Sequence, residues 1–162
     1  MNDTTPGFPS RMFALGLDNP TNPVNVGHVL RAADAYGAVM VALTGNCKVK
    51  SSTDTSRAAF RIPVIRGKCL HDCIPYNCVP VAVELIEGAV DLRKFVHPHN
   101  AFYVFGSEGA TLGRRVTSWC KHVVYVPTRI CMNLSACVNV VCYDRVLKQM
   151  VQEGEVSLLM NR

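Results

Sequence analysis

The stretch His122–Arg145, HVVYVPTRICMNLSACVNVVCYDR, constrains the fold of this 162-residue chain more than any other stretch. It begins with a β-rich run that stops at Pro127, because proline cannot donate a hydrogen bond to a sheet. A short loop then leads into an apolar helix whose N-cap is Asn133 or Ser135. The free N–H groups at such a helix start can bind a polar ligand. Taken alone, this stretch is better explained as an ordinary strand–helix connection.

Apolar runs alternate with helical patterns along the chain, which predicts an α/β fold with a mostly parallel sheet flanked by helices. The predicted strands are Arg11–Leu17, Ala38–Leu43, Val79–Leu85, Ala101–Phe105 and His122–Val126. The predicted helices are Asn25–Tyr36, Ser56–Phe60, Asp91–Phe95, Leu112–Trp119 and the one that starts near Asn133. Ligands of such sheets bind beyond the carboxyl ends of the strands, where three polar loops fall.

The length predicts a single domain over residues 1–150, followed by a tail or short docking element at 151–162. No apolar run approaches the ~20 residues that span a bilayer. The polar first residues contain no hydrophobic region typical of a signal peptide. The eight cysteines form no evenly spaced disulfide framework. Free thiols in a reducing compartment explain them most simply, so we expect a cytoplasmic protein without a membrane partner.

The positive charge of the chain is concentrated in one segment. The chain carries a formal net charge of +5, and the segment from Lys48 to Lys68, which we call the basic segment, accounts for all of it. The other 141 residues hold 11 basic and 11 acidic side chains. The basic residues of the segment are opposed by Asp54 alone; they are Lys48, Lys50, Arg57, Arg61, Arg66 and Lys68. Such a segment suits phosphate binding and predicts an RNA-binding face, although a solvated basic loop has the same composition.

A cluster of cysteines and a histidine could in principle ligate zinc. Cys69, His71, Cys73 and Cys78 lie within ten residues of one another. Their spacing matches no common zinc site, and the apolar pattern around them fits a buried helix face. We therefore predict no metal site. The sequence His97-Pro98-His99 before a strand is interpreted as a turn rather than a ligand pair.

The three polar loops contain motifs that resemble the SpoU/TrmH class of SPOUT methyltransferases, which methylate RNA at the ribose 2′-oxygen. The first motif comprises Asn22-Pro23 with Asn25, Gly27, Arg31 and Gly37. The second is Phe105-Gly106-Ser107-Glu108, and the third runs from Pro127 to Met132-Asn133-Leu134-Ser135. The motifs occur in the order found in the family, and the similarity extends from Arg11 to Lys148. The chain is most similar to the minimal members without a separate RNA-binding domain.

The resemblance implies a C-terminal trefoil knot in which S-adenosyl-L-methionine binds as the methyl donor. The positions that match cofactor-binding ones are Glu84, Leu85, Gly106, Val126, Thr128, Met132, Leu134 and Ser135. The residues carried over as catalytic are Arg31, Glu108, Asn133 and Asn25. Arg31 is expected to be essential, either as the general base or as a clamp for the substrate phosphate. A guanidinium is normally always protonated, so the sequence leaves both roles open.

We expect an S-adenosyl-L-methionine-dependent RNA 2′-O-methyltransferase that acts on tRNA as a homodimer. The dimer is inferred from the apolar helix at Leu134–Cys142 and from the resemblance, and Val138 and Val141 are predicted to lie in its interface. Two alternatives stay open: a catalytically silent RNA-binding or cofactor-sensing module, and a methyltransferase that acts on an RNA base.

Overall fold

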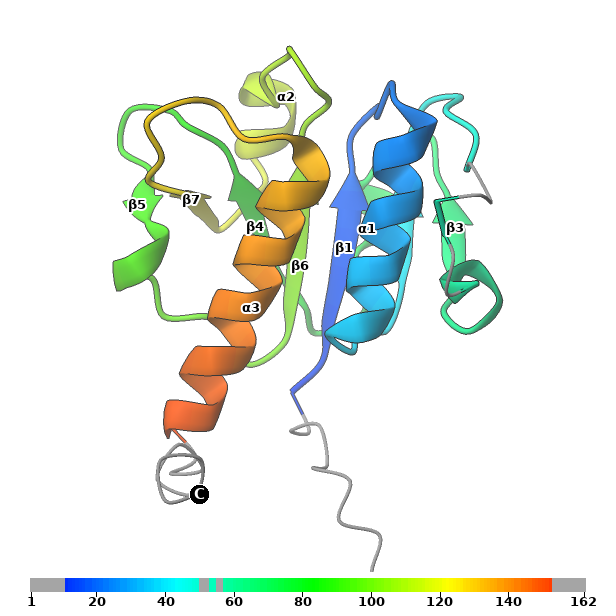
Figure 1. Cartoon of the computed structure of the whole chain (residues 1–162). Coiled ribbons are helices and arrows are strands. Elements are labelled where there is room, and N and C mark those ends of the chain that lie inside the picture. Colours follow the sequence, from blue (N-terminus) through cyan, green and yellow to red (C-terminus); the bar gives the residue numbers. More distant parts are fainter. Residues whose placement is uncertain (1–10, 50–52, 55–56, 153–162) are drawn as a thin grey trace, which may run out of the picture.

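A parallel sheet of seven strands forms the centre of the protein (Figure 1). The structure, a computed structural model, describes residues 11–49, 53–54 and 57–152. The strand order is β3-β2-β1-β6-β4-β7-β5, and all six neighbouring pairs are parallel. The strands are β1 Phe13–Leu17, β2 Val41–Leu43, β3 Val64–Arg66, β4 Val79–Val83, β5 Val90–Asp91, β6 Ala101–Phe105 and β7 His122–Tyr125. The predicted α/β class is therefore confirmed.

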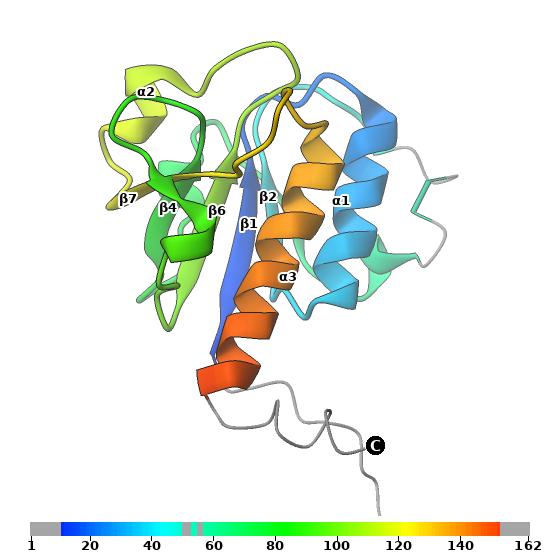
Figure 2. The same cartoon turned by 60° about the vertical axis from the view of Figure 1, so that its left-hand side comes forward.

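Two long helices, α1 (Pro23–Ala35) and α3 (Leu134–Gln152), pack against each other on one face of the sheet (Figure 2). The short helix α2 (Gly113–Thr117) follows β6. Helix α1 begins two residues earlier than predicted, because proline is well suited to the first helical position and the Asn22 side chain accepts a hydrogen bond from Val24 N at 2.9 Å. Three 3₁₀ turns complete the elements: η1 Ala58–Phe60, η2 His71–Cys73 and η3 Leu92–Lys94.

Asn133 is the N-cap residue of α3, directly before the first helical residue. Its Oδ1 accepts hydrogen bonds from Ser135 N at 2.9 Å and from Ser135 Oγ at 2.8 Å. This is the N-cap geometry that satisfies an otherwise unpaired N–H group of the first turn. Of the two cap residues that the sequence allows, the structure therefore selects Asn133.

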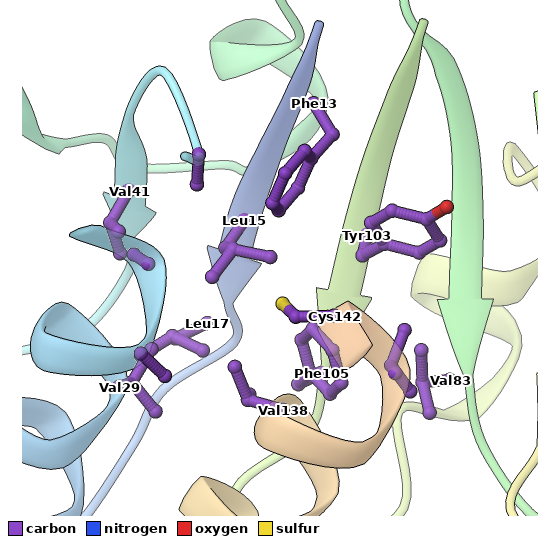
Figure 3. Close-up of a cluster of buried hydrophobic side chains, with 14 of the residues drawn as sticks. Phe13, Leu15, Leu17, Val29, Val41, Val83, Tyr103, Phe105, Val138 and Cys142 are labelled. Carbon is purple, nitrogen blue, oxygen red and sulfur yellow. The ribbon is translucent and has the colours of Figure 1, made fainter. Parts of the chain in front are cut away.

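The sheet is buried on both faces by side chains that alternate along each strand. On one face, β1 and β6 contribute Phe13, Leu15, Tyr103 and Phe105, which pack against α1 and α3 (Figure 3). The opposite face carries the alternate residues of the same strands, such as Phe102. Gly16 lies on this second face, where an added Cβ would stand 2.6 Å from the Phe102 ring. A side chain at residue 16 would thus displace the central aromatic of that face.

A polar cluster lies near the amino ends of the central strands, and we call it the anchor network. It consists of His97, Tyr103, Asp144, Arg145 and Lys148. His97 Nδ1 lies 2.6 Å from the Tyr103 hydroxyl and His97 Nε2 lies 2.8 Å from Asp144 Oδ2. The carboxylate can only accept, so Nε2–H donates to it and Nδ1 accepts from the hydroxyl. The network fixes the second half of α3 to the sheet.

Arg145 is the centre of the anchor network, although arginine is rarely buried. Its side chain is fully buried and lies over the rings of Phe13 and Tyr103. It donates to Pro98 O and His99 O, both at 2.8 Å, and to the Tyr103 hydroxyl at 3.1 Å. The His97 side chain is 3% exposed in this network, so its role is more specific than that of the turn residue predicted from the sequence.

Several elements differ from the sequence-based expectation. The strands β3 and β5 were not predicted, because they contain three and two residues and show no repeated apolar pattern. Helix α3 continues through Gln152, two residues into the predicted tail, and residues 153–162 lie outside the described part of the chain. In that described part, none of the helices is long and apolar enough to cross a membrane. The trefoil knot stays a prediction from the resemblance.

Candidate functional site

The topology brings the three motif loops to one edge of the sheet. The strands β1, β6, β4 and β7 are neighbours and run parallel, so the loops that follow them leave the sheet at the same edge. The chain order reverses between β1 and β6, since β1 leads to β2 and β3 on one side and the later strands lie on the other. A reversal of this kind is where open α/β sheets bind ligands.

A continuous chain of hydrogen bonds ties these loops together, and we call it the loop-linking chain. Glu108 accepts from Thr21 Oγ1 at 2.9 Å through Oε2 and from Asn25 Nδ2 through Oε1. Asn133 Nδ2 donates to Asn25 Oδ1 at 3.1 Å, and Ser135 N and Oγ donate to Asn133 Oδ1. Thus three residues expected to be catalytic, Glu108, Asn25 and Asn133, hold one another in place.

The carboxylate of Glu108 is matched to its donors. Burial pushes its pKa upward, but the hydrogen bonds from Asn25 and Thr21 outweigh burial and hold the pKa below its usual value. Glu108 is therefore ionised at neutral pH and links its own loop after β6 to the loop and first helical turn after β1. Thr21 was not predicted as a site residue, because an exposed threonine in a turn has no distinctive sequence signal.

Beside the loop-linking chain lies a cavity of about 610 Å³. It is bounded by the residues that follow β4, β6 and β7 and by the first turn of α3. Seven of the eight residues expected to bind the cofactor line it: Glu84, Leu85, Gly106, Val126, Thr128, Met132 and Leu134. Ser135, the eighth, instead contributes to a neighbouring groove.

Glu84 joins two walls of this cavity. Its Oε2 accepts from Leu112 N at 2.8 Å, which ties the end of β4 to the loop that follows β6. Its Oε1 accepts from Leu85 N at 2.9 Å. Cys131 and Cys137 also line the cavity, and burial raises the pKa of the Cys137 thiol to about 11. Cys137 is therefore protonated and behaves as a small apolar wall residue.

Arg31 lies outside the cavity. It lines a groove of about 340 Å³ between α1 and α3, together with His28, Tyr36, Ser135 and Asn139. The loop-linking chain runs from the cavity to the groove, because Glu108 lines the cavity and Ser135 lines the groove. Within one copy of the protein, the residue expected to be essential and the predicted cofactor positions thus belong to adjacent but different concavities.

A further brace, absent from the sequence-based prediction, supports the first loop. Asp18 directly follows β1 and is buried. It accepts from Arg115 Nη2 of α2 at 2.5 Å and from Thr44 Oγ1 at 3.1 Å. Thr44 Oγ1 in turn accepts from Asn19 N at 2.8 Å. The ends of β1 and β2 and helix α2 are therefore linked before the chain reaches the first motif.

The basic segment is divided between the two edges of the sheet. Arg66 is the last residue of β3, and Lys48 and Lys68 follow β2 and β3, so all three lie at the cavity edge. Arg57 and Arg61 flank η1, which precedes β3 and so lies at the opposite edge. Lys50 lies outside the described residues. The described basic residues therefore do not form the single continuous face that the sequence suggested.

The thiols of the cysteine-rich stretch pack into the second face of the sheet. Cys73 and Cys78 contact that core, and burial raises the pKa of both thiols. Cys73 Sγ donates to Cys69 O at 3.5 Å. Within residues 11–49, 53–54 and 57–152, no group of three or more His, Cys, Asp or Glu side chains is placed to hold a metal ion.

The family model described as the SpoU rRNA methylase family matches residues 12–143. The chain therefore belongs to the SpoU rRNA methylase family. One curated relative, a 23S rRNA (guanosine-2′-O-)-methyltransferase of Blochmanniella floridana, is 24% identical over 155 residues, which are 88% of this chain and 60% of the relative. The chain thus spans less than two thirds of that relative's length.

Solved structures are similar in fold. The SpoU methyltransferase AviRb from Streptomyces viridochromogenes, in complex with AdoMet, has a TM-score of 0.75 at 20% identity, over 87% of this chain and 62% of that one. A structure concerning the 2-OH methylation of C/U34 on tRNA has a TM-score of 0.69 at 22% identity, over 83% of this chain and 94% of that one. At these identities the two structures support the fold.

Proposed function

We propose that the protein transfers the methyl group of S-adenosyl-L-methionine to a ribose 2′-hydroxyl of RNA. The observation that carries the proposal is the loop-linking chain from Thr21 to Ser135, which holds the three family motifs around one cavity. A binding module would not need such mutual fixation of Glu108, Asn25 and Asn133. Positioning of this kind contributes most of the rate in reactions whose reagent is already activated.

The cavity suits this cofactor in size and in charge. Its volume of about 610 Å³ falls in the range of small-molecule sites, ~300–1,000 Å³. Apolar side chains such as Leu85, Met132 and Leu134 offer contacts to an adenine ring. The carboxylates of Glu84 and Glu108 outnumber the one cation of the lining, Arg129, which favours a ligand with a sulfonium and an ammonium group. The bound cofactor would supply the electrophilic methyl group.

In this proposal Arg31 binds and orients the substrate. A guanidinium holds a phosphate through paired hydrogen bonds and remains charged, so it fits a clamp better than a general base. The groove around Arg31 also contains His28, which lies one helical turn before it on α1. Replacement of Arg31 by Lys, which retains the charge but loses the planar fork, separates the clamp from a simple electrostatic effect.

We further propose a homodimer formed by the outer face of α3. An apolar stripe with helical spacing is exposed there: Ala136, Val140, Tyr143, Leu147 and Val151. The stripe begins at the Arg31 groove, which Ala136 also lines, so a second copy would cover both. Val138 and Val141, predicted as interface residues, are instead fully buried in the core of one copy. Tyr143→Glu is therefore a suitable interface variant, whereas changes at the two valines would disrupt the core.

As the substrate we propose tRNA. The support is the similarity in fold to a structure concerned with methylation of tRNA, of which this chain covers 94%. The curated relative from Blochmanniella acts, by its name, on 23S rRNA, so the test must include both RNAs.

The experiment is a transfer assay with radiolabelled S-adenosyl-L-methionine on purified tRNA and rRNA, followed by alkaline hydrolysis and nucleoside mass spectrometry. A ribose 2′-O-methyl group blocks cleavage of the adjacent phosphodiester, whereas a methylated base does not. We expect alkali-resistant dinucleotides from tRNA. A labelled base would favour the base-methylation alternative, and cofactor binding without transfer to either RNA would favour a silent binding module.

A further inference from the structure

An aromatic side chain of the basic segment is almost entirely exposed. Phe60, the last residue of η1, is 89% exposed. A phenylalanine in water lacks the stabilisation that burial would give it, so an aromatic side chain this exposed is a candidate for contact with a ligand. Because Phe60 lies between Arg57 and Arg61 in the chain, we do not interpret it as part of an apolar patch that binds another protein.

The backbone beneath Phe60 is held firmly. The buried carboxylate of Asp54 accepts from Ala58 N at 2.8 Å and from Ala59 N at 3.0 Å. Ala58 is fully buried, and Phe60 N donates to Arg57 O at 3.0 Å. Arg57 itself has a left-handed backbone with φ of 54°, a conformation that costs a non-glycine residue energy. The turn therefore presents the ring on a fixed support.

The charges around the turn favour an anionic partner. Arg61 forms a two-pronged ion pair with Asp34 of α1, so it braces the turn. Both acids that contact the turn have partners of their own: Asp34 pairs with Arg61, and Asp54 accepts from backbone N–H groups. Arg57 is exposed, and no acid of the described residues pairs with it. A ring beside an unopposed cation fits a nucleotide, whose base stacks while its phosphate is bound.

We propose that Phe60 is a stacking platform for an unpaired base of the RNA substrate and that Arg57 contacts a neighbouring phosphate. The inference rests on the proposed function and adds a second contact point to it. Helix α1 leads from Asn25 at the cavity edge, past Arg31, to Asp34 beside the turn, a rise of about 14 Å. The stacked base is accordingly a few nucleotides from the methylated one, in a loop or an unpaired end, where bases are free to stack.

The test compares Phe60→Ala with Phe60→Trp and with a control, Tyr76→Ala. Tyr76 is 96% exposed but lies outside the basic segment, so it matches Phe60 in exposure and not in surroundings. The probes are a single-stranded mixed-sequence RNA of about a dozen nucleotides and a duplex of the same length, because such sites take ~4–16 nucleotides. We expect Phe60→Ala to weaken single-strand binding about tenfold, Phe60→Trp to restore it, and Tyr76→Ala to leave it unchanged.

Arg57→Ala should lower the slope of log affinity against log salt by about one for the single strand. Equal affinity of Phe60→Ala and wild type for the single strand, with RNA methylation intact, overturns the platform and leaves the proposed function standing. A change in sedimentation instead of RNA affinity means that the ring contacts protein, which also overturns it. If the wild type binds cofactor but no RNA, both proposals fail. Calorimetric binding of S-adenosyl-L-methionine by each variant checks that the fold is intact.

Discussion

Helix α3 is held at its two ends by two polar clusters that differ in their surroundings. At its start, the loop-linking chain lies beside a cavity of about 610 Å³. In its second half, the anchor network is sealed, and Arg145 is fully buried in it. Most polar side-chain groups of the two clusters are hydrogen-bonded, although in the described part of the chain Arg145 Nε is buried without a partner. The comparison shows that a hydrogen-bonded polar cluster stabilises the fold where it is buried, whereas beside a cavity it fixes the positions of groups that meet a ligand.

The largest expected effect is on stability, from Arg145→Met. The change leaves the carbonyls of Pro98 and His99 and the Tyr103 hydroxyl without their buried donor, so we expect a loss of about 3–5 kcal/mol in the free energy of unfolding. Urea denaturation measures it. Arg93→Met is the control, because the exposed side chain of Arg93 pairs with Asp91 at the surface, where solvent screens the interaction, so we expect a much smaller loss. Equal losses for the two variants would contradict a structural role for the anchor network.

The second prediction concerns pH and the same network. Burial lowers the pKa of His97 to about 4, although hydrogen bonding to Asp144 opposes the shift. Between pH 4 and the usual value of 6.5, the unfolded chain binds a proton that the folded chain does not. The free energy of unfolding should therefore fall by about 3 kcal/mol as the pH is lowered through this window, and be fully retained above it.

Replacement of His97 by Gln should remove this dependence, whereas His99→Gln, at an exposed histidine of the same segment, should retain it. Urea denaturation at a series of pH values gives the slopes. A His97→Gln variant with the wild-type slope would show that another group titrates in the window.

At the open edge the largest effect is expected on catalysis. Glu108→Gln replaces one of the two acceptor oxygens by an NH₂ donor. The amide can then no longer accept from both Asn25 and Thr21, which use different oxygens of Glu108. A misplaced loop should reduce the methyl-transfer rate about a hundredfold. The free energy of unfolding should change by less than about 1 kcal/mol, because the cluster is partly exposed. The control Glu87→Gln, at an exposed position, should retain wild-type transfer; a stability loss as large as that of Arg145→Met would remove the distinction between the edges.

The smallest effect is expected from Thr21→Val, which keeps the shape of the side chain and removes its hydrogen bond to Glu108. The loss of one such bond, about 1 kcal/mol, corresponds to a roughly fivefold slower transfer. Thr117→Val, at a threonine of α2 outside the cavity lining that also loses one side-chain hydrogen bond, is the matched control. Single-turnover kinetics at saturating cofactor measures the step. Identical rates for the two variants would limit the loop-linking chain to Glu108, Asn25 and Asn133.

The comparison also shows how far the sequence leads. Apolar runs predicted five of the seven strands, because burial on two faces leaves a continuous apolar pattern, and helical periodicity predicted both long helices. The anchor network could not be predicted, since nothing in the sequence distinguishes a buried Arg145 from an exposed one. The same holds for Val138 and Val140, which are two residues apart on one apolar helix, one in the core and the other on the surface.

At the site, sequence reasoning identified the loops but not the contacts within them. It named Glu108, Asn25 and Asn133 among the catalytic residues but did not predict that hydrogen bonds join them into one unit. Thr21 and Arg115 were missed, because their partners Glu108 and Asp18 are 87 and 97 residues away in the chain. Contacts between distant loops depend on the sheet order, which the sequence of one chain does not specify.

Calorimetric titration of the purified protein with S-adenosyl-L-methionine tests most directly the central claim that the motif loops form a cofactor site. The account predicts saturable binding, one cofactor per chain, with a Kd of about 1–100 µM. Gly106→Val should abolish the binding, because Gly106 lines the cavity and an added Cβ would already lie 3.3 Å from Ala110 O. A titration without measurable heat up to about 1 mM cofactor, confirmed by an unchanged melting temperature, would contradict the account.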